Sequence, residues 1–337
     1  MVSDRWPTDG LEAVAICPYC GSTGRILAHE GVEDRAFACA PGQWNYWSCS
    51  RCHCLYLNPR PTLVTVGKAY ARYYTHRGAV GGGLLSAFRR RLRNEYWSSA
   101  MCTSIQPRLG LPRWLGWALS WLKPYIAEPF GLRQWVQAPK GLLIDVGCGN
   151  GEKLKLAAQL GWQTLGMEMD ASAVQAAQAQ GLNVLQGGYE QLEQYPGQAD
   201  CVVCSHVLEH VHEPVRLLRL LLAALRPNGV LLLSAPNASS FLRRHYGDNW
   251  RGLEAPRHLA IPDAAWLVSW LHAQGFECTQ VLSYPLETAV ESERMRRSAS
   301  SASKKDVAAA KAWLRGTAAV LPNQDDMVQL ICTRGRG

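Results

Sequence analysis

Residues 142–151 constrain the fold of this 337-residue chain more than any other stretch. They read Leu-Leu-Ile-Asp-Val-Gly-Cys-Gly-Asn-Gly, an apolar run with Asp145 followed by glycines at positions 147, 149 and 151. The apolar run predicts the end of a buried parallel strand. The glycines allow a sharp turn and let a ligand lie close to the backbone. Because the spacing differs from the G-x-G-x-x-G of dinucleotide-binding folds, the loop need not be shaped for a pyrophosphate.

Strand-like and helix-like segments alternate from residue 141 to about residue 285. Short apolar runs separated by helical patterns are typical of a parallel sheet with helices on both faces. We therefore predict an α/β fold with a doubly wound, Rossmann-like sheet. Residues 327–333 are expected to add an antiparallel strand, and the Ser-, Arg- and Ala-rich residues 286–320 an insertion. The predicted parallel strands are residues 142–146, 163–168, 182–186, 200–204, 230–234 and 276–283, and the helices between them are 152–160, 171–180, a leucine-rich helix from Pro214 that ends at 227–229, and 263–274.

Glu168 ends the second predicted strand, seventeen residues after Gly151, where a ribose diol would find a pair of acceptors. The alternative is an exposed acid at a strand end. Asp170, two residues on, can instead cap the following helix. The loop, the carboxylate and the order of the later elements resemble motif I and the acidic strand-2 residue of class I S-adenosylmethionine-dependent methyltransferases. The resemblance implies that the glycine loop holds the methionine moiety of S-adenosylmethionine and that Glu168 binds the ribose hydroxyls.

The resemblance also implies adenine contacts after the third strand, where many family members carry an acid. This chain has Gly188 at the matching position, so backbone or stacking contacts from Gly188 and Tyr189 are expected instead. The predicted cofactor-binding residues are Asp145, Gly147, Gly149, Gly151, Glu168, Met169, Gly188, Tyr189 and Ser205.

Two histidine-bearing segments follow the fourth and fifth strands. Residues 205–214 resemble the H-x-L-E-H segment of the same superfamily, and residues 256–259 resemble the P-R-H-L stretch of bacterial methyltransferases with an N-terminal zinc module. These side chains can act as bases or bind a metal, or they can merely orient loops through hydrogen bonds. Arg257 is a predicted anion clamp, with lid packing as the alternative, and His212 is expected to be solvated. The predicted catalytic residues are His206, Glu209, His210 and His258.

In the first 61 residues, four of the twelve cysteines form two C-x-x-C pairs separated by 28 residues. Each pair closes a tight turn that directs two thiolates to one point, and two such turns complete a tetrahedral site. The predicted ligands of a structural zinc ion are Cys17, Cys20, Cys49 and Cys52, with four unrelated buried thiols as the alternative. Cys39, His53 and Cys54 are further ligand types nearby, and replacement of Cys52 by His53 or Cys54 is the alternative ligand set. The other cysteines are expected to be buried thiols in a reducing cytoplasm.

The net charge of +8 is concentrated in one part of the chain. Residues 60–133 contain twelve Lys and Arg against two acids. Trp114, Trp117 and Trp121 fall on one helical face there. We predict a helical, basic cap with solvated arginines. The alternatives for residues 84–123 are contact with a membrane surface or with nucleic acid. Prolines 107, 112 and 124 limit any continuous helix, which weakens the membrane alternative.

Taken together, these motifs predict an S-adenosylmethionine-dependent methyltransferase with three parts: a zinc ribbon at 1–61, the basic cap at 62–139, and the methyltransferase domain at 140–337. The combination is similar to bacterial methyltransferases that tailor sugars, natural products or cell-surface precursors, which implies a small-molecule acceptor methylated at oxygen, nitrogen or carbon. The alternatives are a ribosomal RNA methyltransferase and a non-catalytic cofactor-binding subunit. No signal peptide or spanning helix is expected, so the predicted location is the cytoplasm.

Overall fold

The computed structural model describes residues 6–70, 84–118, 130–283, 285–298, 300–316 and 324–335. The chain divides into two compact units. The first consists of Met1–Tyr73, Cys204–Leu222 and Leu233–Gly337, and the second of Tyr74–Val203 and Ala223–Leu232. The proposed division into three parts, with boundaries at residues 61 and 139, stays a prediction.

A seven-stranded sheet has the order β12-β13-β10-β9-β6-β7-β8. Strands β6, β7 and β8 pair in parallel, and β12 pairs with β13 antiparallel. In β6 the consecutive residues Leu143 to Val146 are buried, as a strand covered on both faces requires. The sheet confirms the predicted α/β class. The strands are β6 Leu142–Val146, β7 Gln163–Glu168, β8 Val184–Gln186, β9 Ala199–Ser205, β10 Leu225–Pro236, β12 Phe276–Gln280 and β13 Met327–Arg334.

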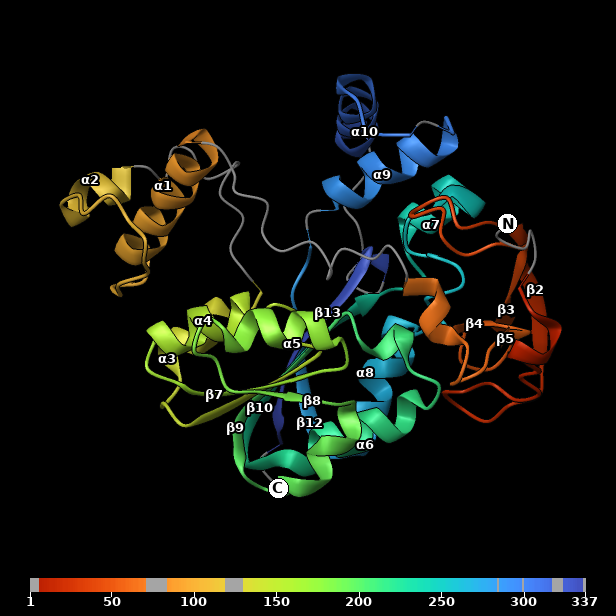
Figure 1. Cartoon of the computed structure of the whole chain (residues 1–337), viewed down its shortest axis with the longest axis horizontal. Helices are drawn as coiled ribbons and strands as arrows, with labels where there is room; N and C mark the ends of the chain where they lie inside the picture. The colour runs from red at the N-terminus through yellow and green to blue at the C-terminus, as the bar shows by residue number, and fades with distance from the viewer. Residues whose placement is uncertain are drawn as a thin grey trace. The chain divides into compact units, whose positions relative to one another are not determined.

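Helices connect these strands much as the hydrophobic periodicity predicts. Helix α4 (Glu152–Gln159) packs against β6 and β7, and α5 (Ala171–Gln178) packs against β7 and β8 (Figure 1). Asp170 caps α5, because its carboxylate accepts hydrogen bonds from the backbone N–H groups of Ser172 and Ala173. Helix α6 spans Pro214–Ala224 and α8 spans Ala264–Ala273. Strand β10 begins at Leu225, earlier than predicted. The predicted turn at 227–229 therefore lies within the strand, where Asn228 has a φ of 66°.

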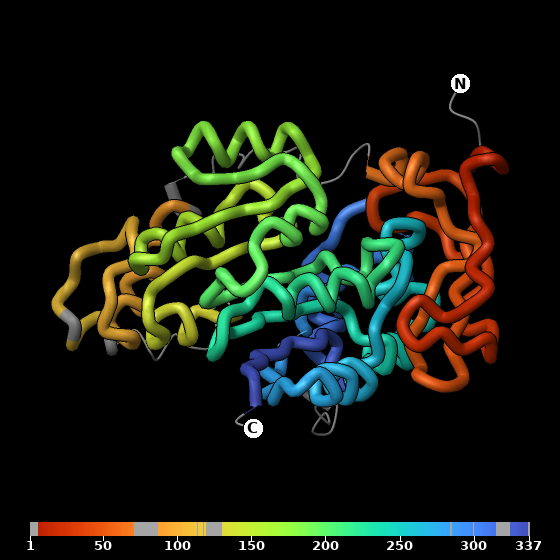
Figure 2. The backbone as a smooth tube through the Cα atoms, turned by 90° about the horizontal axis from the view of Figure 1, so that it is seen from below, coloured from red at the N-terminus to blue at the C-terminus, as the bar shows by residue number. Residues whose placement is uncertain are grey.

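The predicted insertion at 286–320 contains two helices. Helix α9 spans Leu286–Arg296 and α10 spans Lys304–Gly316, and the two pack against each other (Figures 1 and 2). Residues 317–323 lie outside the described residues. Helix α7 (Phe241–Tyr246) also contacts α9. The insertion is thus a folded helical pair that packs on a neighbouring part of the first unit.

The N-terminal region forms a four-stranded antiparallel sheet that includes a strand from far along the chain. Its order is β11-β4-β3-β2, and β11 (Ala260–Ile261) pairs with β4 (Leu55–Leu57). The remaining strands are β2 (Arg25–Val32) and β3 (Trp44–Cys49). A short ladder joins β1 (Leu11–Glu12) to β5 (Arg60–Pro61). The buried core between this sheet and the loop after α7 includes Trp44, Tyr46, Leu55, Leu57, Trp250, Leu253 and Leu259.

Within the described residues, the basic segment contains α-helices, and the non-helical residues 101–112 separate the first two of them. Helix α1 (Leu84–Ala100) contacts α2 (Arg113–Ala118), and α3 (Leu132–Gln137) follows. Arg89, Arg90 and Arg91 are exposed, as predicted for solvated arginines. Trp114 is 71% exposed, whereas Trp121 and the side chain of Trp117 lie outside what the structure describes. None of the described helices is long and apolar enough to cross a membrane.

Several cysteines depart from the expectation of buried free thiols, since Cys102 is exposed and Cys39 is half-buried. Cys278 of β12 and Cys332 of β13 face each other in the antiparallel register and form a disulfide. The sequence pattern does not reveal the pair because 54 residues separate them. Cys148, Cys201 and Cys204 are buried free thiols, as expected.

Candidate functional site

The glycine loop leaves β6 with a backbone that favours glycine. Gly147, Gly149 and Gly151 have φ values of 71°, 55° and 80°, a region in which a Cβ is strained. A Cβ on Gly151 would clash with the Leu182 side chain, so this glycine permits close packing. A Cβ on Gly149 would meet nothing within 4 Å. The backbone at Gly149 therefore borders open space, which suits the approach of a ligand.

Glu168, at the end of β7, is tied to this loop. One carboxylate oxygen accepts a hydrogen bond from the Gly149 N–H at 2.9 Å, and the other accepts one from the Asp170 N–H at 2.9 Å. A carboxylate has about four acceptor positions, so each oxygen keeps capacity for a further donor. The arrangement is that of a fixed pair of acceptors beside the loop, which suits the predicted contact with a ribose diol better than a freely exposed acid does.

Asp145 lies on β6 beneath the loop and is buried. Its Oδ2 has no hydrogen-bond partner among the described residues. Burial raises the pKa of Asp145 from 3.8 to about 6, with Lys153 opposing the rise and Glu168 adding to it. An orphaned buried carboxylate is costly unless a donor or cation satisfies it. The site therefore fits the predicted ammonium-bearing methionine moiety.

We expect Asp145→Asn to stabilise the ligand-free protein at pH 7. Folding favours the protonated carboxyl, so the ionised form costs stability progressively as pH rises from about 4 to about 6. The gain should be about 3 kcal/mol above pH 6, because each pKa unit corresponds to about 1.4 kcal/mol. It should vanish below about pH 4. Urea denaturation of the wild type and of Asp145→Asn at several pH values measures this gain. Equal stability of the two proteins at pH 7 would contradict the raised pKa of Asp145.

The other predicted cofactor contacts are side chains and backbone groups that are partly or largely exposed. Met169 is 76% exposed, and Gly188 and Tyr189 are partly buried at the start of the 3-10 helix Tyr189–Gln194. Ser205 ends β9 and is partly buried. These four positions stay predictions of cofactor contact.

In the first unit, His206 and Glu209 form a hydrogen-bonded pair directly after β9. His206 Nδ1 lies 3.3 Å from Glu209 Oε1, and the His206 side chain is 56% exposed whereas Glu209 is fully buried. Burial alone would raise the pKa of Glu209, but the hydrogen bond from His206 and the nearby histidines hold it below its usual value. His206 has a φ of 59°, a conformation uncommon outside glycine and enriched at functional sites.

His210 and His258 meet beside this pair. Their ring centroids are 4.7 Å apart. His210 Nδ1 lies 2.9 Å from the Tyr70 hydroxyl and 3.1 Å from the carbonyl oxygen of Arg257. His258 Nδ1 lies 2.7 Å from the carbonyl oxygen of Gly252. Burial lowers the pKa of His258 to about 4, so its ring is neutral at pH 7. The structure thus brings all four predicted catalytic residues together.

The structure contradicts two further expectations about this region. Arg257 is fully buried and binds both carboxylate oxygens of Asp34, at 2.5 and 3.0 Å, so it is not available as an anion clamp. Its Nε also donates to Glu254 at 3.1 Å. His212 is buried rather than solvated, and its Nε2 lies 2.9 Å from the carbonyl oxygen of Pro61. Both corrections have one cause, which is that the N-terminal region packs over these loops.

The sequence pattern did not reveal Tyr70, Asp34 or Glu254 as parts of this cluster. Tyr70 lies at the end of a short 3-10 helix, Val66–Tyr70, and Asp34 follows β2. Both lie in stretches that carry no motif. Glu254 was visible only as an acid within a polar loop, and its buried carboxylate has a pKa of about 2, since the nearby His258, Arg251 and Arg257 outweigh its burial. The one feature of the sequence that could have indicated this group is that a buried Arg257 would need an acidic partner.

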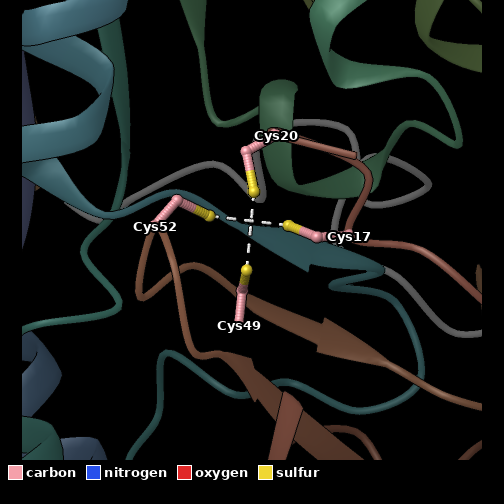
Figure 3. A group of neighbouring side chains, drawn as sticks. All are labelled: Cys17, Cys20, Cys49 and Cys52. Atoms are coloured by element: carbon pink, nitrogen blue, oxygen red, sulfur yellow. Dashed lines mark hydrogen bonds between the residues drawn. The ribbon is translucent and has the colours of Figure 1, made fainter. Parts of the chain in front are cut away.

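The four cysteines of the two C-x-x-C pairs come together as predicted (Figure 3). The sulfur atoms of Cys17 and Cys52 are 3.5 Å apart, as are those of Cys20 and Cys49. A tetrahedral zinc ion with Zn–S bonds of about 2.3 Å needs sulfur atoms about 3.8 Å apart, so the donor set fits zinc closely. Cys54 is not one of the four clustered residues, and its sulfur accepts a hydrogen bond from the Asp263 N–H.

Comparisons with known proteins find similar methyltransferases. A sequence family described as "Methyltransferase domain" matches residues 110–281, about half of the chain. Ubiquinone biosynthesis O-methyltransferases are similar over a shorter stretch. That of Xanthomonas campestris pv. campestris strain B100 is 31% identical over 109 residues, which is 30% of this chain and 46% of the relative. That of Pseudomonas aeruginosa strain LESB58 is 32% identical over 117 residues, 31% of this chain and 49% of the relative.

The chain therefore spans less than half the length of these curated relatives. Among solved structures, a SAM-dependent methyltransferase from Archaeoglobus fulgidus has a TM-score of 0.42 and 18% identity, covering 71% of this chain and 97% of the other. One from Mesorhizobium loti has a TM-score of 0.42 and 16% identity, covering 60% and 95%. On the strength of the sequence match over residues 110–281, which contains the glycine loop and Glu168, this chain belongs to the methyltransferase domain family.

Proposed function

We propose that this protein is an S-adenosylmethionine-dependent methyltransferase that methylates an oxygen of a small-molecule acceptor. The observation that carries the proposal is the hydrogen bond between Gly149 and Glu168, because it fixes an open glycine turn beside a pair of carboxylate acceptors. The family match supports the same activity. The relatives named ubiquinone biosynthesis O-methyltransferase support a small acceptor with a hydroxyl group.

The residues of the second unit would hold the cofactor. Asp145 would accept from the ammonium group, Gly149 would lie against the methionine moiety, and Glu168 would bind the two ribose hydroxyls. When bound, S-adenosylmethionine supplies an electrophilic methyl group attached to a sulfonium. The chain itself contributes by orienting the reactants, which can account for a large share of the rate of a two-substrate reaction.

We propose that His206 is the general base that removes the proton from the acceptor's hydroxyl group. Its Nδ1 is engaged by buried Glu209, so Nε2 of the exposed ring is left to take a proton from a hydroxyl. A carboxylate behind a histidine fixes the ring and stabilises the imidazolium that forms. His206 also follows directly on β9, which neighbours β6 in the sheet. His210 and His258 are more buried and serve less well as the first proton acceptor.

Replacing His206 by asparagine is expected to lower kcat by roughly 10²–10⁴, the usual contribution of general base catalysis. The dissociation constant for S-adenosylmethionine should change little, because the substitution leaves the glycine loop and Glu168, which would hold the cofactor, unaltered. Steady-state kinetics together with calorimetry separate the two effects. The matched control is His272→Asn, which alters an exposed histidine of α8. A kcat for His206→Asn equal to that of the control would exclude His206 as the base.

We also propose that the four-cysteine cluster holds a structural zinc ion. Four thiolates complete the coordination of zinc and leave no position for a substrate. The ion would fix the turn after β3 against the segment before β2, and would thereby stabilise a sheet that also contains β11. Its role is therefore to support the fold around the histidine cluster (His206, Glu209, His210 and His258) rather than to take part in the chemistry.

The test of the function is methyl transfer from isotopically labelled S-adenosylmethionine to a panel of hydroxylated small molecules, read by mass spectrometry. A methyl ether product supports the proposal. A second candidate is RNA methylation, which the exposed Arg89, Arg90 and Arg91 of α1 favour. Label incorporated only into RNA, with binding that weakens steeply as salt is raised, would support that reading instead. Cofactor binding with neither product would point to a non-catalytic partner subunit.

A further inference from the structure

One group of side chains in the first unit has the composition of a metal site and is separate from the four cysteines. Glu209, His210 and His258 each offer a ligand atom, and these atoms lie within 4.8 Å of one another. We propose that these three residues bind a divalent first-row transition-metal ion such as zinc. Imidazole and carboxylate ligands suit such ions. With bonds of about 2.1 Å, a tetrahedral ion would draw the three atoms to about 3.4 Å apart, a movement of an ångström or so.

The two histidines are already oriented as metal ligands usually are. A ligating histidine almost always donates its second ring N–H to a carbonyl or a carboxylate, which fixes the ring and its tautomer. His258 Nδ1 lies 2.7 Å from the carbonyl oxygen of Gly252, and His210 Nδ1 lies 3.1 Å from that of Arg257. Donation from Nδ1 leaves the lone pair of Nε2 on each ring. Tyr70, 2.9 Å from His210 Nδ1, is a further outer contact.

Glu209 supplies an independent reason for a cation here. Its side chain is fully buried, and its Oε2 has no hydrogen-bond partner among the described residues. Oε1 is engaged by His206, so one oxygen remains for an ion. The two arginines of the loop that carries His258 form ion pairs with other acids: Arg257 pairs with Asp34 and Glu254, and Arg251 pairs with Glu254. A buried carboxylate oxygen without a donor is costly, and a metal ion would satisfy it.

The three ligands also come from two loops that the reaction needs in place. Glu209 and His210 belong to the loop after β9, and His258 belongs to the loop before β11. The Leu259 N–H already donates to the carbonyl oxygen of Glu209 at 2.7 Å, so the loops meet at this point. An ion would fasten them together. Three protein ligands leave one position open, as in catalytic rather than structural sites.

The catalytic consequence rests on the proposed function, whereas the binding site stands on geometry alone. An acceptor hydroxyl at the open position would ionise more readily, because the ion stabilises the oxygen anion. The proton released would pass to His206 Nε2, and the oxygen would attack the methyl carbon. The oxygen–carbon bond would form as the carbon–sulfur bond breaks, and the sulfonium would leave as the neutral thioether S-adenosylhomocysteine. This places hydroxylated acceptors, rather than amines, as the substrate class of the site.

The test measures a second metal ion on the intact protein. The protein is treated with EDTA, its remaining zinc is counted by mass spectrometry, and ZnCl₂ is then titrated by calorimetry. The wild type should take up one further equivalent beyond the zinc of the cysteine cluster. Glu209→Gln and His210→Asn should weaken this step at least about tenfold, since even outer contacts of metal ligands contribute that much. His272→Asn, an exposed histidine outside the group, should bind as the wild type does.

Circular dichroism shows whether His210→Asn folds. If it does not, the zinc affinity of Glu209→Gln, which keeps the size of the side chain, tests the proposal. No further equivalent in the wild type, or unchanged affinity in Glu209→Gln, would overturn the proposal. The proposed function has a separate readout: methyl transfer without a second metal ion refutes only the metal site. A second ion bound by a protein that methylates no hydroxylated acceptor refutes only the function.

Discussion

Cys49→Ser is expected to remove zinc from the protein and to unfold the N-terminal sheet. Structural zinc sites contribute roughly 10–16 kcal/mol in small zinc-binding domains, which is comparable to the whole stability of a typical domain, about 5–15 kcal/mol. Cys49 is the last residue of β3, so the loss acts directly on the centre of the sheet. Zinc stoichiometry and a thermal melt followed by tryptophan fluorescence measure the effect.

The damage should extend to the histidine cluster. The Tyr19 hydroxyl, within the first C-x-x-C turn, donates to the carbonyl oxygen of Ala260 in β11, and Tyr46 of β3 donates to that of His258. Unfolding the sheet therefore releases the loop that carries His258. Cys102→Ser is the matched control, because this free thiol is exposed and belongs to the second unit rather than to the four-cysteine cluster. If Cys49→Ser melted at the same temperature as Cys102→Ser, the four cysteines would have no structural role.

Glu168→Ala is expected to raise the dissociation constant for S-adenosylmethionine at least roughly 100-fold. Hydrogen bonds to a charged group contribute about 1.5–3 kcal/mol each, and the carboxylate would accept two from the ribose. A tenfold change in affinity corresponds to about 1.4 kcal/mol. The substitution also frees the Gly149 N–H, so the glycine loop loses its anchor. Calorimetric titration of the cofactor into the purified protein measures the change.

A matched control is available one helix away. Glu152→Ala removes an exposed acid from the first turn of α4 without touching the carboxylate of Glu168. It should leave the cofactor affinity within about threefold of the wild type, since an exposed charge contributes little. Equal affinities for Glu168→Ala and Glu152→Ala would place the cofactor elsewhere, and the glycine loop would then need another explanation.

The parts of the fold that could be predicted are those whose signal is local. The strand at 142–146 and the helix from Glu152 follow from an apolar run, a glycine turn and a helical period, all within one short segment. The cap at Asp170 is equally local. The cysteine cluster was predictable because each C-x-x-C turn is local, and because four thiolates have few other uses.

The errors concern residues whose environment is set by distant parts of the chain. Arg257 binds Asp34, 223 residues away, and no pattern near either residue shows the pairing. His212 is covered by Pro61 in the same way. The disulfide of Cys278 depends on the register of two strands. A side chain's exposure is a tertiary property, so a polar loop sequence looks solvated until the segment that covers it is known.

The pairing of β11 with β4 has a consequence for how the chain folds during synthesis. The four cysteines are complete by residue 52, so they can take up zinc while most of the protein has not yet been made. The strand that covers β4 comes only at residues 260 and 261. Until then β4 is an edge with unpaired backbone groups, which other chains can join. The nascent N-terminal sheet therefore passes through a long period of vulnerability to aggregation, which ends only when the loop that bears His258 arrives.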